Sequence, residues 1–434
     1  MTKQASFTGR APGRIDVMGG VADYSGSLVL QMPIVQETTV RFTQHDDNSI
    51  TVISRDGQTE LNFSATLGAV GLQETIDYDD VRARLRHIEG GDWASYVVGC
   101  IAVLIKEKNI EYTGGRFVIE SDVPLGKGVS SSAALEIATM NALEACFGVS
   151  FQGTEKAVLA QRAENRVVGA PCGLMDQLVC AFGKHNCLLP IVCQPDILEE
   201  PCALPPGVFF KGIDSGVKHS VGASHYSRAR AAAFMGYSFV VSHEGMERKD
   251  FDAFIGKGRS EQLPYGGYLA NIGTEKFMQL ENILPESIAG KNFLAEYGGT
   301  IDPIVRIEEE TVYPVRAAVR HAVYENHRIS EFLALLLRAN KSRADLRDCL
   351  RAMGELMFQS HQSYTEIGLG HEMTDRIAGL VSECNSNGLY GARITGGGSG
   401  GTVCVLGCDD EGLDKLRYVT GTYEKISGYK PMVI

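Results

Sequence analysis

Glycines and serines gather in the segment PLGKGVSSSAALEIATMNAL, which runs from Pro124 to Leu143. Glycine allows backbone conformations that other residues avoid, so successive N–H groups can turn toward one anion. The serines then begin an apolar run with helical spacing, and the N-terminus of a helix attracts phosphate. An ordinary turn with a serine cap is the alternative. The favoured prediction is a phosphate-binding loop built from Gly126, Gly128, Ser130, Ser131 and Ser132.

A second glycine-rich block, GARITGGGSGGTVCVL, runs from Gly391 to Leu406. Its glycines at 396, 398 and 401 formally match GxGxxG, but a dinucleotide-binding loop should open a helix. Here TVCVL continues as a strand, so the sequence argues against a dinucleotide site. Two interpretations remain open: a backbone that lies close to a phosphate, or a sharp hairpin between two strands.

The third block, APGRIDVMGGVADYSGSLVLQMPI, extends from Ala11 to Ile34 and places Arg14 and Asp23 around a glycine-rich turn. A cation at this place suits the charge of a transferring phosphoryl group, and a carboxylate can hold hydroxyl groups. Surface salt bridges are the alternative for both residues. The chain has no GxxxxGK[ST] motif, so any nucleotide site must use a different loop.

The overall composition is that of a globular chain of two domains, with 434 residues, 44% hydrophobic and 22% charged. A formal net charge of −12 argues against binding to nucleic acid or to an anionic membrane. We expect a cytoplasmic protein because neither a signal peptide nor a membrane-spanning stretch is recognisable. The eleven cysteines form no paired CxxC modules, so neither disulfides nor a structural zinc site is expected.

The segment CQPDILEEPCALPPG, residues 193–207, is rich in proline and acidic residues between two apolar runs, which is typical of a domain crossing. We therefore predict domains at 1–204 and 205–434, with mixed α+β structure in both. Alternating patterns predict strands over 28–42 and 115–120 and a strand pair around Gly396. Helical spacing is found over 93–106, 132–146, 316–337, 342–364 and 371–384, whereas residues 241–301 have weaker helical patches.

The three blocks together resemble the motifs of the GHMP kinase family, in the order and spacing of that family. PCGLMDQ at 171–177, DSGVKHSVGASHY at 214–226 and SHQSY at 360–364 are similar to segments of its galactokinase branch. Within that branch, three segments resemble the kinase portion of the arabinokinase subgroup: VMGGVADYSGSLVLQMPI at 17–34, PYGGYLANI at 264–272 and LPESIAGKNFLAEYG at 284–298. The resemblance implies a left-handed βαβ unit in the N-terminal domain and a ferredoxin-like C-terminal domain, which together bind ATP and a sugar.

The resemblance also implies which residues bind ATP and Mg²⁺. The loop Ser130–Ser132 would cover the nucleotide phosphates, and Ser132 and Glu164 would hold the magnesium ion. Trp93 would lie near the adenine, although an ordinary core position is equally compatible with the sequence. Lys127 stands where the family usually has glycine or alanine, and a contact to phosphate and a solvated side chain both remain open.

Asp176 matches the catalytic aspartate of the family and would orient or deprotonate the anomeric hydroxyl of a sugar. Arg14 would steady that carboxylate and the transferring phosphoryl group, while Gly173 of the same PCGLMDQ segment would border the sugar. Tyr226 matches a tyrosine that contacts the sugar, with a buried tyrosine as the alternative. Asp214 replaces the asparagine often found at its position, which leaves its contact with the sugar open.

Galactokinases usually carry GEHTDY in the block at Ala11–Ile34, where glutamate and histidine contact the C6 hydroxymethyl group, and this chain has GGVADY. Gly20 and Val21 take those positions while Asp23 remains, so we predict L-arabinose, which lacks C6, as the preferred sugar. D-Galactose is the alternative if another loop, such as one from residues 241–301, fills the C6 space. A non-catalytic sensor of ATP and sugar is disfavoured because Arg14, Ser132, Glu164 and Asp176 are all present. The chain begins almost at the block Ala11–Ile34, so we expect it to act alone, with its oligomeric state open.

Overall fold

The computed structural model describes residues 5–56, 59–73, 75–170, 172–217, 224–384 and 388–434. Its internal contacts divide the chain into two compact units, neither of which is one continuous segment. Unit 1 consists of residues 1–14, 33–125 and 129–185, and unit 2 of residues 15–32, 126–128 and 186–434. The predicted domain boundary near Leu204 falls inside the last segment of unit 2 and stays a prediction.

The sheet of unit 1 has the strand order β4–β3–β5–β2, with β1 paired to β2. β3 and β4 form an antiparallel hairpin, β3 runs parallel to β5, and β5 is antiparallel to β2. The strands are β1 (Ser6–Met18), β2 (Leu28–Gln44), β3 (Ser49–Asp56), β4 (Thr59–Thr66) and β5 (Gly115–Ser121). β1 and β2 each contain residues of both units.

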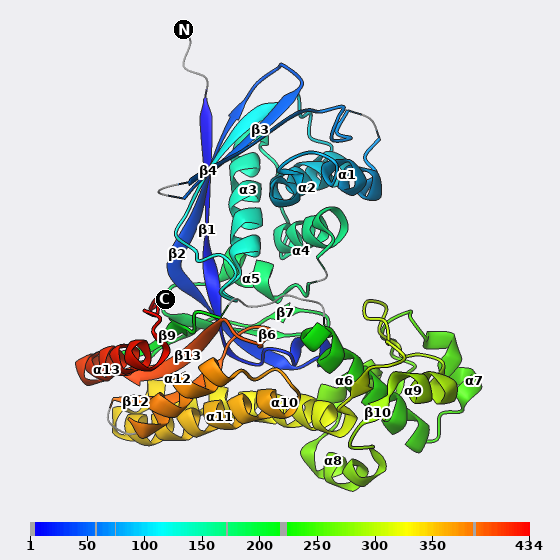
Figure 1. Ribbon diagram of the computed structural model, residues 1–434, viewed down its shortest axis with the longest axis vertical. Helices are drawn as coiled ribbons and strands as arrows, with labels where there is room; N and C mark the ends of the chain where they lie inside the picture. Colours follow the sequence, from blue (N-terminus) through cyan, green and yellow to red (C-terminus); the bar gives the residue numbers. More distant parts are fainter. Residues whose placement is uncertain (1–4, 57–58, 74, 171, 218–223, 385–387) are drawn as a thin grey trace. The chain divides into compact units, whose positions relative to one another are not determined.

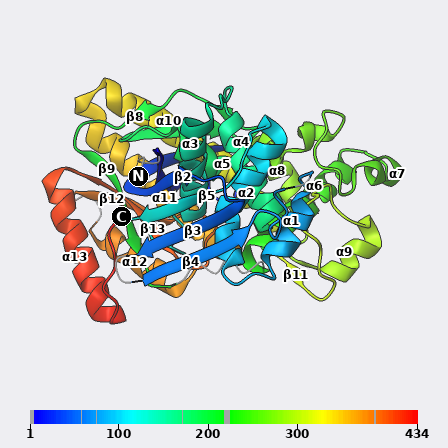
Figure 2. The same cartoon turned by 90° about the horizontal axis from the view of Figure 1, so that it is seen from above.

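Helices cover one face of this sheet, as Figures 1 and 2 show. They are α1 (Tyr78–Leu85), α2 (Gly91–Lys108), α3 (Ser131–Phe147), α4 (Glu155–Arg162), the π-helix η2 (Ala163–Val168) and α5 (Met175–Phe182). Glycine allows β1 to approach α3 closely, because a Cβ atom on Gly9 would lie 2.0 Å from the carbonyl oxygen of Ala138. This contact fixes α3, whose N-terminal residues belong to the first glycine–serine block.

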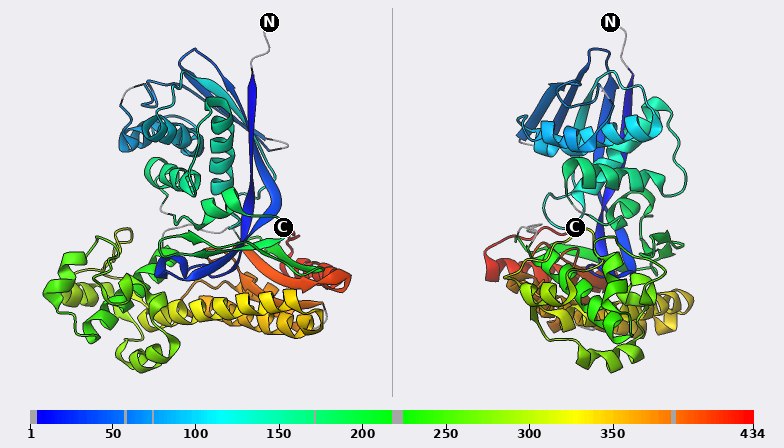
Figure 3. Two further views of the ribbon diagram at one scale, coloured as in Figure 1. Left: turned by 180° about the vertical axis from the view of Figure 1, so that it is seen from behind. Right: turned by 90° about the vertical axis from the view of Figure 1, so that its right-hand side faces the viewer.

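Unit 2 contains a second, antiparallel sheet with the strand order β12–β13–β9. Its strands are β9 (Val208–Asp214), β12 (Leu389–Ile394) and β13 (Thr402–Cys408), while β6 (Cys187–Val192), β7 (Ile197–Leu198) and β8 (Cys202–Ala203) extend the first sheet from the start of β2. The helices beside the second sheet are α10 (Val315–Lys341), η7 (Arg343–Asp345), α11 (Leu346–Glu366), α12 (Glu372–Glu383) and α13 (Asp409–Ser427). α10 and α11 run side by side along this sheet (Figure 3).

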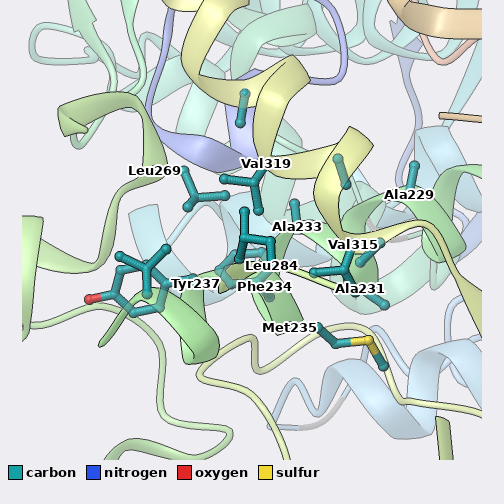
Figure 4. Packing of buried hydrophobic residues seen from close by; sticks show 14 of the residues in the cluster. Ala229, Ala231, Ala233, Phe234, Met235, Tyr237, Leu269, Leu284, Val315 and Val319 are labelled. Atoms are coloured by element: carbon teal, nitrogen blue, oxygen red, sulfur yellow. The ribbon is translucent and has the colours of Figure 1, made fainter. Parts of the chain in front are cut away.

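The remaining helices of unit 2 are short and pack around α6 (Ser224–His243) and the start of α10. They are α7 (Arg248–Phe251), η3 (Asp252–Phe254), η4 (Pro264–Gly267), η5 (Leu269–Asn271), α8 (Thr274–Leu280), η6 (Glu281–Ile283) and α9 (Gly290–Tyr297), with the strands β10 (Ile288–Ala289) and β11 (Val312–Tyr313). Figure 4 shows Phe234 and Tyr237 of α6 beside Val319 of α10, Leu269 and Leu284 in one apolar cluster. This cluster ties residues 241–301 to the rest of unit 2.

The main elements predicted from spacing are confirmed by the helices and strands of the structure. The strand pair around the second glycine block is β12 and β13, so that block is a loop between antiparallel strands. The helix predicted from Ser342 is an exception, because Ser342 has extended backbone and α11 begins only at Leu346. No helix in the described part of the chain combines the length and the apolar character needed to cross a membrane.

Candidate active site

The carboxylate of Asp176 lies in the first turn of α5 and receives three hydrogen bonds within unit 1. Arg14 donates from Nε to Oδ1 at 2.9 Å and from Nη2 to Oδ2 at 3.1 Å. Ser130 donates from Oγ to Oδ2 at 2.6 Å. The structure thus brings together three residues that are distant in sequence and were predicted to act in one site.

Arg14 is 5% exposed, whereas the side chain of Asp176 is 26% exposed. A buried guanidinium is costly unless its charge is paired, and the two parallel bonds provide that pairing with fixed geometry. Asp176 is therefore held in one orientation while part of its carboxylate stays accessible. Such a carboxylate can align a hydroxyl group or accept its proton.

The backbone of the first glycine–serine block has the unusual conformations that the sequence predicts. Gly126, Gly128 and Ser130 have φ values of 69°, 73° and 57°. For serine this left-handed conformation is uncommon, and strained residues of this kind cluster at functional sites. Ser130 is the N-cap residue of α3 but makes no side-chain cap, because its hydroxyl is bonded to Asp176.

A second carboxylate group of unit 1 lies next to this loop. Glu164, in η2, accepts hydrogen bonds from Gln177 Nε2 at 2.6 Å and from the thiol of Cys172 at 3.2 Å. Burial raises the pKa of Glu164, and the charge of Asp176 raises it further, while hydrogen bonds from Cys172 and Ser132 act in the opposite direction. The predicted pair Ser132 and Glu164 is therefore in contact.

Gln177 links Glu164 to Glu136, a fully buried carboxyl group on α3. Gln177 Nε2 also donates to Oε2 of Glu136 at 3.1 Å, while Oε1 of Glu136 is buried and has no hydrogen-bond partner among the described residues. Burial, and then the charge of Glu164, raise the pKa of Glu136 well above its usual value. Sequence analysis missed both residues, although Glu136 interrupts an apolar helix and Gln177 directly follows Asp176.

These residues fit a magnesium ion. Carboxylate and hydroxyl oxygens are the hard ligands that Mg²⁺ prefers, and it usually takes only one or two carboxylates beside phosphates and water. A cation beside Glu164 would also offset the repulsion among Glu136, Glu164 and Asp176. Across the described residues there is no cluster of three or more His, Cys, Asp or Glu side chains arranged for a metal.

In unit 2, the turn Gly19–Tyr24 is packed against a buried ion pair. Asp16 accepts a hydrogen bond from Arg393 Nη1 at 3.1 Å, and both side chains are fully buried. A Cβ atom on Gly20 would lie 2.1 Å from Oδ2 of Asp16 and 2.3 Å from the hydroxyl oxygen of Tyr364. The space beside Gly20 is therefore filled by other polar side chains.

Val21 follows with φ of 62° and is 3% exposed. A positive φ is a genuine outlier for a β-branched residue, so the surrounding packing must hold this turn in place. The side chain of Val21 belongs to the buried apolar cluster of unit 2, together with Tyr24 and Tyr364.

Asp23, half-buried in η1 (Asp23–Ser25), interacts electrostatically with Tyr226 and Arg230 of α6. Tyr226 is packed edge-on against Tyr24, with ring centroids 6.0 Å apart, and burial followed by the charge of Asp23 raises its pKa. Arg230 is fixed by two bonds to Asp302, at 2.8 and 2.9 Å. The structure thus groups the predicted sugar residues Asp23 and Tyr226 with an arginine that sequence analysis did not select.

Lys127 and Asp214, the two residues that differ from the usual family sequence, form an ion pair with each other. Lys127 Nζ lies 2.8 Å from Oδ2 of Asp214, which also accepts a hydrogen bond from the hydroxyl of Tyr429. The solvated interpretation of Lys127 is therefore wrong, because its side chain is only 19% exposed and is engaged in an ion pair. A carboxylate in place of asparagine at 214 provides the countercharge that this lysine needs.

The remaining predicted residues are less constrained by contacts. Trp93 lies in the first turn of α2 and is half-buried, and its Nε1 lies near Gly90. Gly173 is half-buried two residues before α5. Residues 218–223 of the DSGVKHSVGASHY segment lie outside the described residues.

Comparison with known proteins identifies the family in three regions of the chain. The model of the GHMP kinases N-terminal domain matches residues 95–184, and that of the GHMP kinases C-terminal domain matches residues 333–419. The galactokinase galactose-binding signature matches residues 2–43. The first match contains the glycine–serine block and Asp176, and the third contains Arg14 and the turn at Gly20.

Two curated relatives are similar over nearly the whole chain. An L-arabinokinase from Arabidopsis thaliana is 36% identical over 98% of this chain, which spans 45% of that protein's length. A galactokinase from Chloroflexus aggregans (strain MD-66 / DSM 9485) is 29% identical, over 92% of this chain and 83% of its own.

Solved structures of low sequence identity share the fold. Lactococcus lactis galactokinase in complex with galactose has a TM-score of 0.73 at 21% identity, over 99% of this chain and 92% of that one. A mevalonate kinase has a TM-score of 0.58 at 14% identity, over 98% and 97% of the two chains. The α+β, two-domain fold predicted from the sequence is confirmed, and the chain belongs to the GHMP kinase family.

Proposed function

We propose that this protein is a sugar 1-kinase that transfers the γ-phosphoryl group of ATP to the anomeric hydroxyl of L-arabinose. The single observation that carries the proposal is the carboxylate of Asp176, held by Arg14 and Ser130 beside the Ser132–Glu164 pair. Kinases of this family use ATP, and phosphoryl transfer depends mainly on positioning and on charge stabilisation.

In this mechanism Asp176 accepts a hydrogen bond from the anomeric hydroxyl and orients that oxygen toward the phosphoryl group. Arg14 fixes the carboxylate through its two bonds and contributes positive charge as charge develops on the transferring group. Ser130 fixes the other side of the same carboxylate, so the group does not have to reorganise during the reaction.

The nucleotide is assigned to the glycine–serine block, through Gly126, Gly128 and the serines at 130–132, with Trp93 near the adenine. Ser132 and Glu164 would hold Mg²⁺, which when bound supplies charge neutralisation to the phosphates. Gln177 keeps the carboxylate of Glu164 in one orientation. The left-handed backbone at positions 126, 128 and 130 supports the phosphate role, because such backbone turns N–H groups toward an anion.

Asp23 and Tyr226 are assigned to the sugar, with Gly20, Val21 and Gly173 bordering it. The choice of a pentose rests on Gly20 and Val21, which replace two polar residues that contact a hydroxymethyl group in galactokinases. Asp16 and Tyr364 fill the space that a side chain at position 20 would need, so residue 20 offers no side chain to a C6 hydroxymethyl group. The similarity to an L-arabinokinase supports the same choice.

Galactokinase activity is the second candidate, favoured by the galactose-binding signature over residues 2–43 and by the similarity to a galactokinase. One small group in a pocket is worth about 1–3 kcal/mol, so we expect a preference of tens to hundreds rather than an absolute one. The test is ADP release with Mg²⁺ and ATP in the presence of L-arabinose, D-galactose or no sugar. A higher kcat/KM for D-galactose would reverse the assignment, and no sugar-dependent ADP release would refute the kinase proposal.

A further inference from the structure

Side chains from the segment 258–271 converge on the turn that follows Asp23. Arg259 donates a hydrogen bond from Nη2 to the carbonyl oxygen of Tyr24. The ring of Tyr268 lies directly against Gly26, where an added Cβ atom would be 2.2 Å from its Cδ1. Both contacts are made to the turn Tyr24–Gly26, which directly follows Asp23, the predicted sugar-binding carboxylate.

A third contact reaches the same turn through an intermediate side chain. Asn271 and Gln194 exchange two hydrogen bonds, at 2.9 and 3.0 Å, and Gln194 donates to the carbonyl oxygen of Gly26 at 2.6 Å. The turn is therefore held from Tyr24 to Gly26 by one segment of unit 2, which lies more than 230 residues later in sequence.

Arg259 is unusual among these contacts because its guanidinium lies between aromatic rings. Its central carbon is 5.3 Å from the ring centroid of Phe234 and 4.5 Å from that of Tyr268. Among the residues that the structure describes, it has no salt bridge to a carboxylate, and its Nε is buried without a hydrogen-bond partner. Burial lowers the pKa of Arg259, and the positive charge of Arg230 adds to this effect.

The carboxylates that face this cation belong to the proposed sugar site or border it. The charges of Asp302 and Asp23 interact favourably with Arg259, and so does that of Asp196. Burial, and then repulsion from Asp23, raise the pKa of Asp196 to about 6. Arg259 is thus a cation near three carboxylates, and it donates a hydrogen bond to the backbone carbonyl of Tyr24, the residue after Asp23.

We propose that Arg259 is a positioning residue for the sugar, which holds the Asp23 turn through the Tyr24 carbonyl and thereby sets sugar affinity and preference. This inference rests on the proposed function. It places part of the sugar specificity in the segment 258–271, away from the two motifs that contain Asp23 and Asp176. Because Arg259 acts on the turn that carries Asp23, its loss should weaken sugar binding and leave nucleotide binding unchanged.

The test compares Arg259→Met, Arg259→Lys and the control Lys249→Ala. Methionine fills much of the space between the two rings but donates no hydrogen bond, whereas lysine keeps the charge and one donor group. Lys249 is in the same region, with a side chain that is 75% exposed and paired only to Glu247 among the described residues. The readouts are KM for L-arabinose and for D-galactose, KM for ATP, kcat, and the shift in melting temperature caused by sugar alone and by ATP alone.

For Arg259→Met we expect about a tenfold or larger rise in KM for sugar, since a charge-assisted hydrogen bond is lost. The values of kcat and of KM for ATP should stay within about twofold, Arg259→Lys should be intermediate, and Lys249→Ala should match the wild type. An unchanged sugar KM, or an equal loss in sugar and ATP binding, would overturn the role of Arg259. Should Arg259→Met fail to fold, a sugar KM for Arg259→Lys equal to that of the wild type would overturn it.

ADP release by the wild-type protein tells a failure of the kinase proposal apart from a failure of the proposal about Arg259. If it releases no ADP with any neutral pentose or hexose, the kinase assignment itself fails. If it does release ADP and the Arg259 variants behave like the wild type, only the inference about Arg259 fails.

Discussion

The hydroxyl of Ser130 donates a hydrogen bond to Asp176 although Ser130 occupies the N-cap position of α3. A serine at this position usually bonds to the backbone of its own helix, which stabilises the helix by about 1 kcal/mol. Here the hydroxyl is used to fix a carboxylate on another helix. The local structure at Ser130 is therefore explained by the candidate active site rather than by helix stability.

Replacing Ser130 by alanine should lower kcat more than it lowers stability. The variant loses one hydrogen bond to a carboxylate, and Arg14 retains its two bonds, so we expect a fall in kcat of about three- to tenfold. The free energy of unfolding should change by less than about 0.5 kcal/mol, because no side-chain cap is lost. Sugar-dependent ADP release and urea denaturation measure the two quantities, and a clear loss of stability with unchanged kcat would argue against this role.

Replacing Glu136 by glutamine should change the pH dependence of stability. The folded state keeps Glu136 protonated well above the pKa of the unfolded chain, so folded protein binds more protons and its stability falls as pH rises above about 4.5. Glutamine has nearly the same shape and removes this contribution. We expect the variant to gain stability relative to the wild type as pH rises above about 4.5, by up to about 1.4 kcal/mol per pH unit, until Glu136 ionises in the folded protein.

Urea denaturation at several pH values in metal-free buffer measures this difference for Glu136→Gln. Parallel pH profiles for the two proteins would show that Glu136 titrates normally in the folded state. A variant that is less stable at every pH would point instead to a packing role for the carboxyl group.

Replacing Gly20 by alanine should destabilise unit 2 without creating galactose activity. The added methyl group would meet Asp16 and Tyr364, both of which are fully buried, and such overpacking costs about 1–3 kcal/mol. Gly379 in α12 is the matched control, because an added Cβ atom there meets nothing within 4 Å, and Gly379→Ala should be neutral or stabilising. Equal stability of the two variants in urea, or a gain in D-galactose turnover for Gly20→Ala, would contradict the packing at position 20.

The sequence predicted the elements with long, regular patterns and the residues that belong to short motifs. α2, α3, α10 and α12 have apolar spacing over several turns, and β12 and β13 flank an obvious glycine run. Arg14, Ser130 and Asp176 were selected because they stand in recognisable blocks, and the structure brings them into contact. The local sequence was sufficient to predict these elements and residues, because the residue type and its immediate neighbours determine the conformation there.

The sequence did not predict the role of a residue when that role depends on a contact with a residue far away in the sequence. Lys127 and Asp214 were treated as two independent departures from a family pattern, but they are one ion pair. Glu136 looks like an ordinary polar position in a helix, and only the fold shows that Gln177 connects it to Glu164. Arg259 lies in a weakly patterned region and gains its importance from contacts with Tyr24, Phe234 and Tyr268.

The most direct test of the account is the turnover of Asp176→Asn with L-arabinose, Mg²⁺ and ATP. Asparagine keeps the size of the side chain but cannot accept a proton, and the loss of such an interaction costs about 3 kcal/mol. We predict that kcat falls roughly a hundredfold or more, while the melting-temperature shifts caused by sugar and by ATP are retained. Turnover close to that of the wild type would contradict the assignment of Asp176 as the catalytic group.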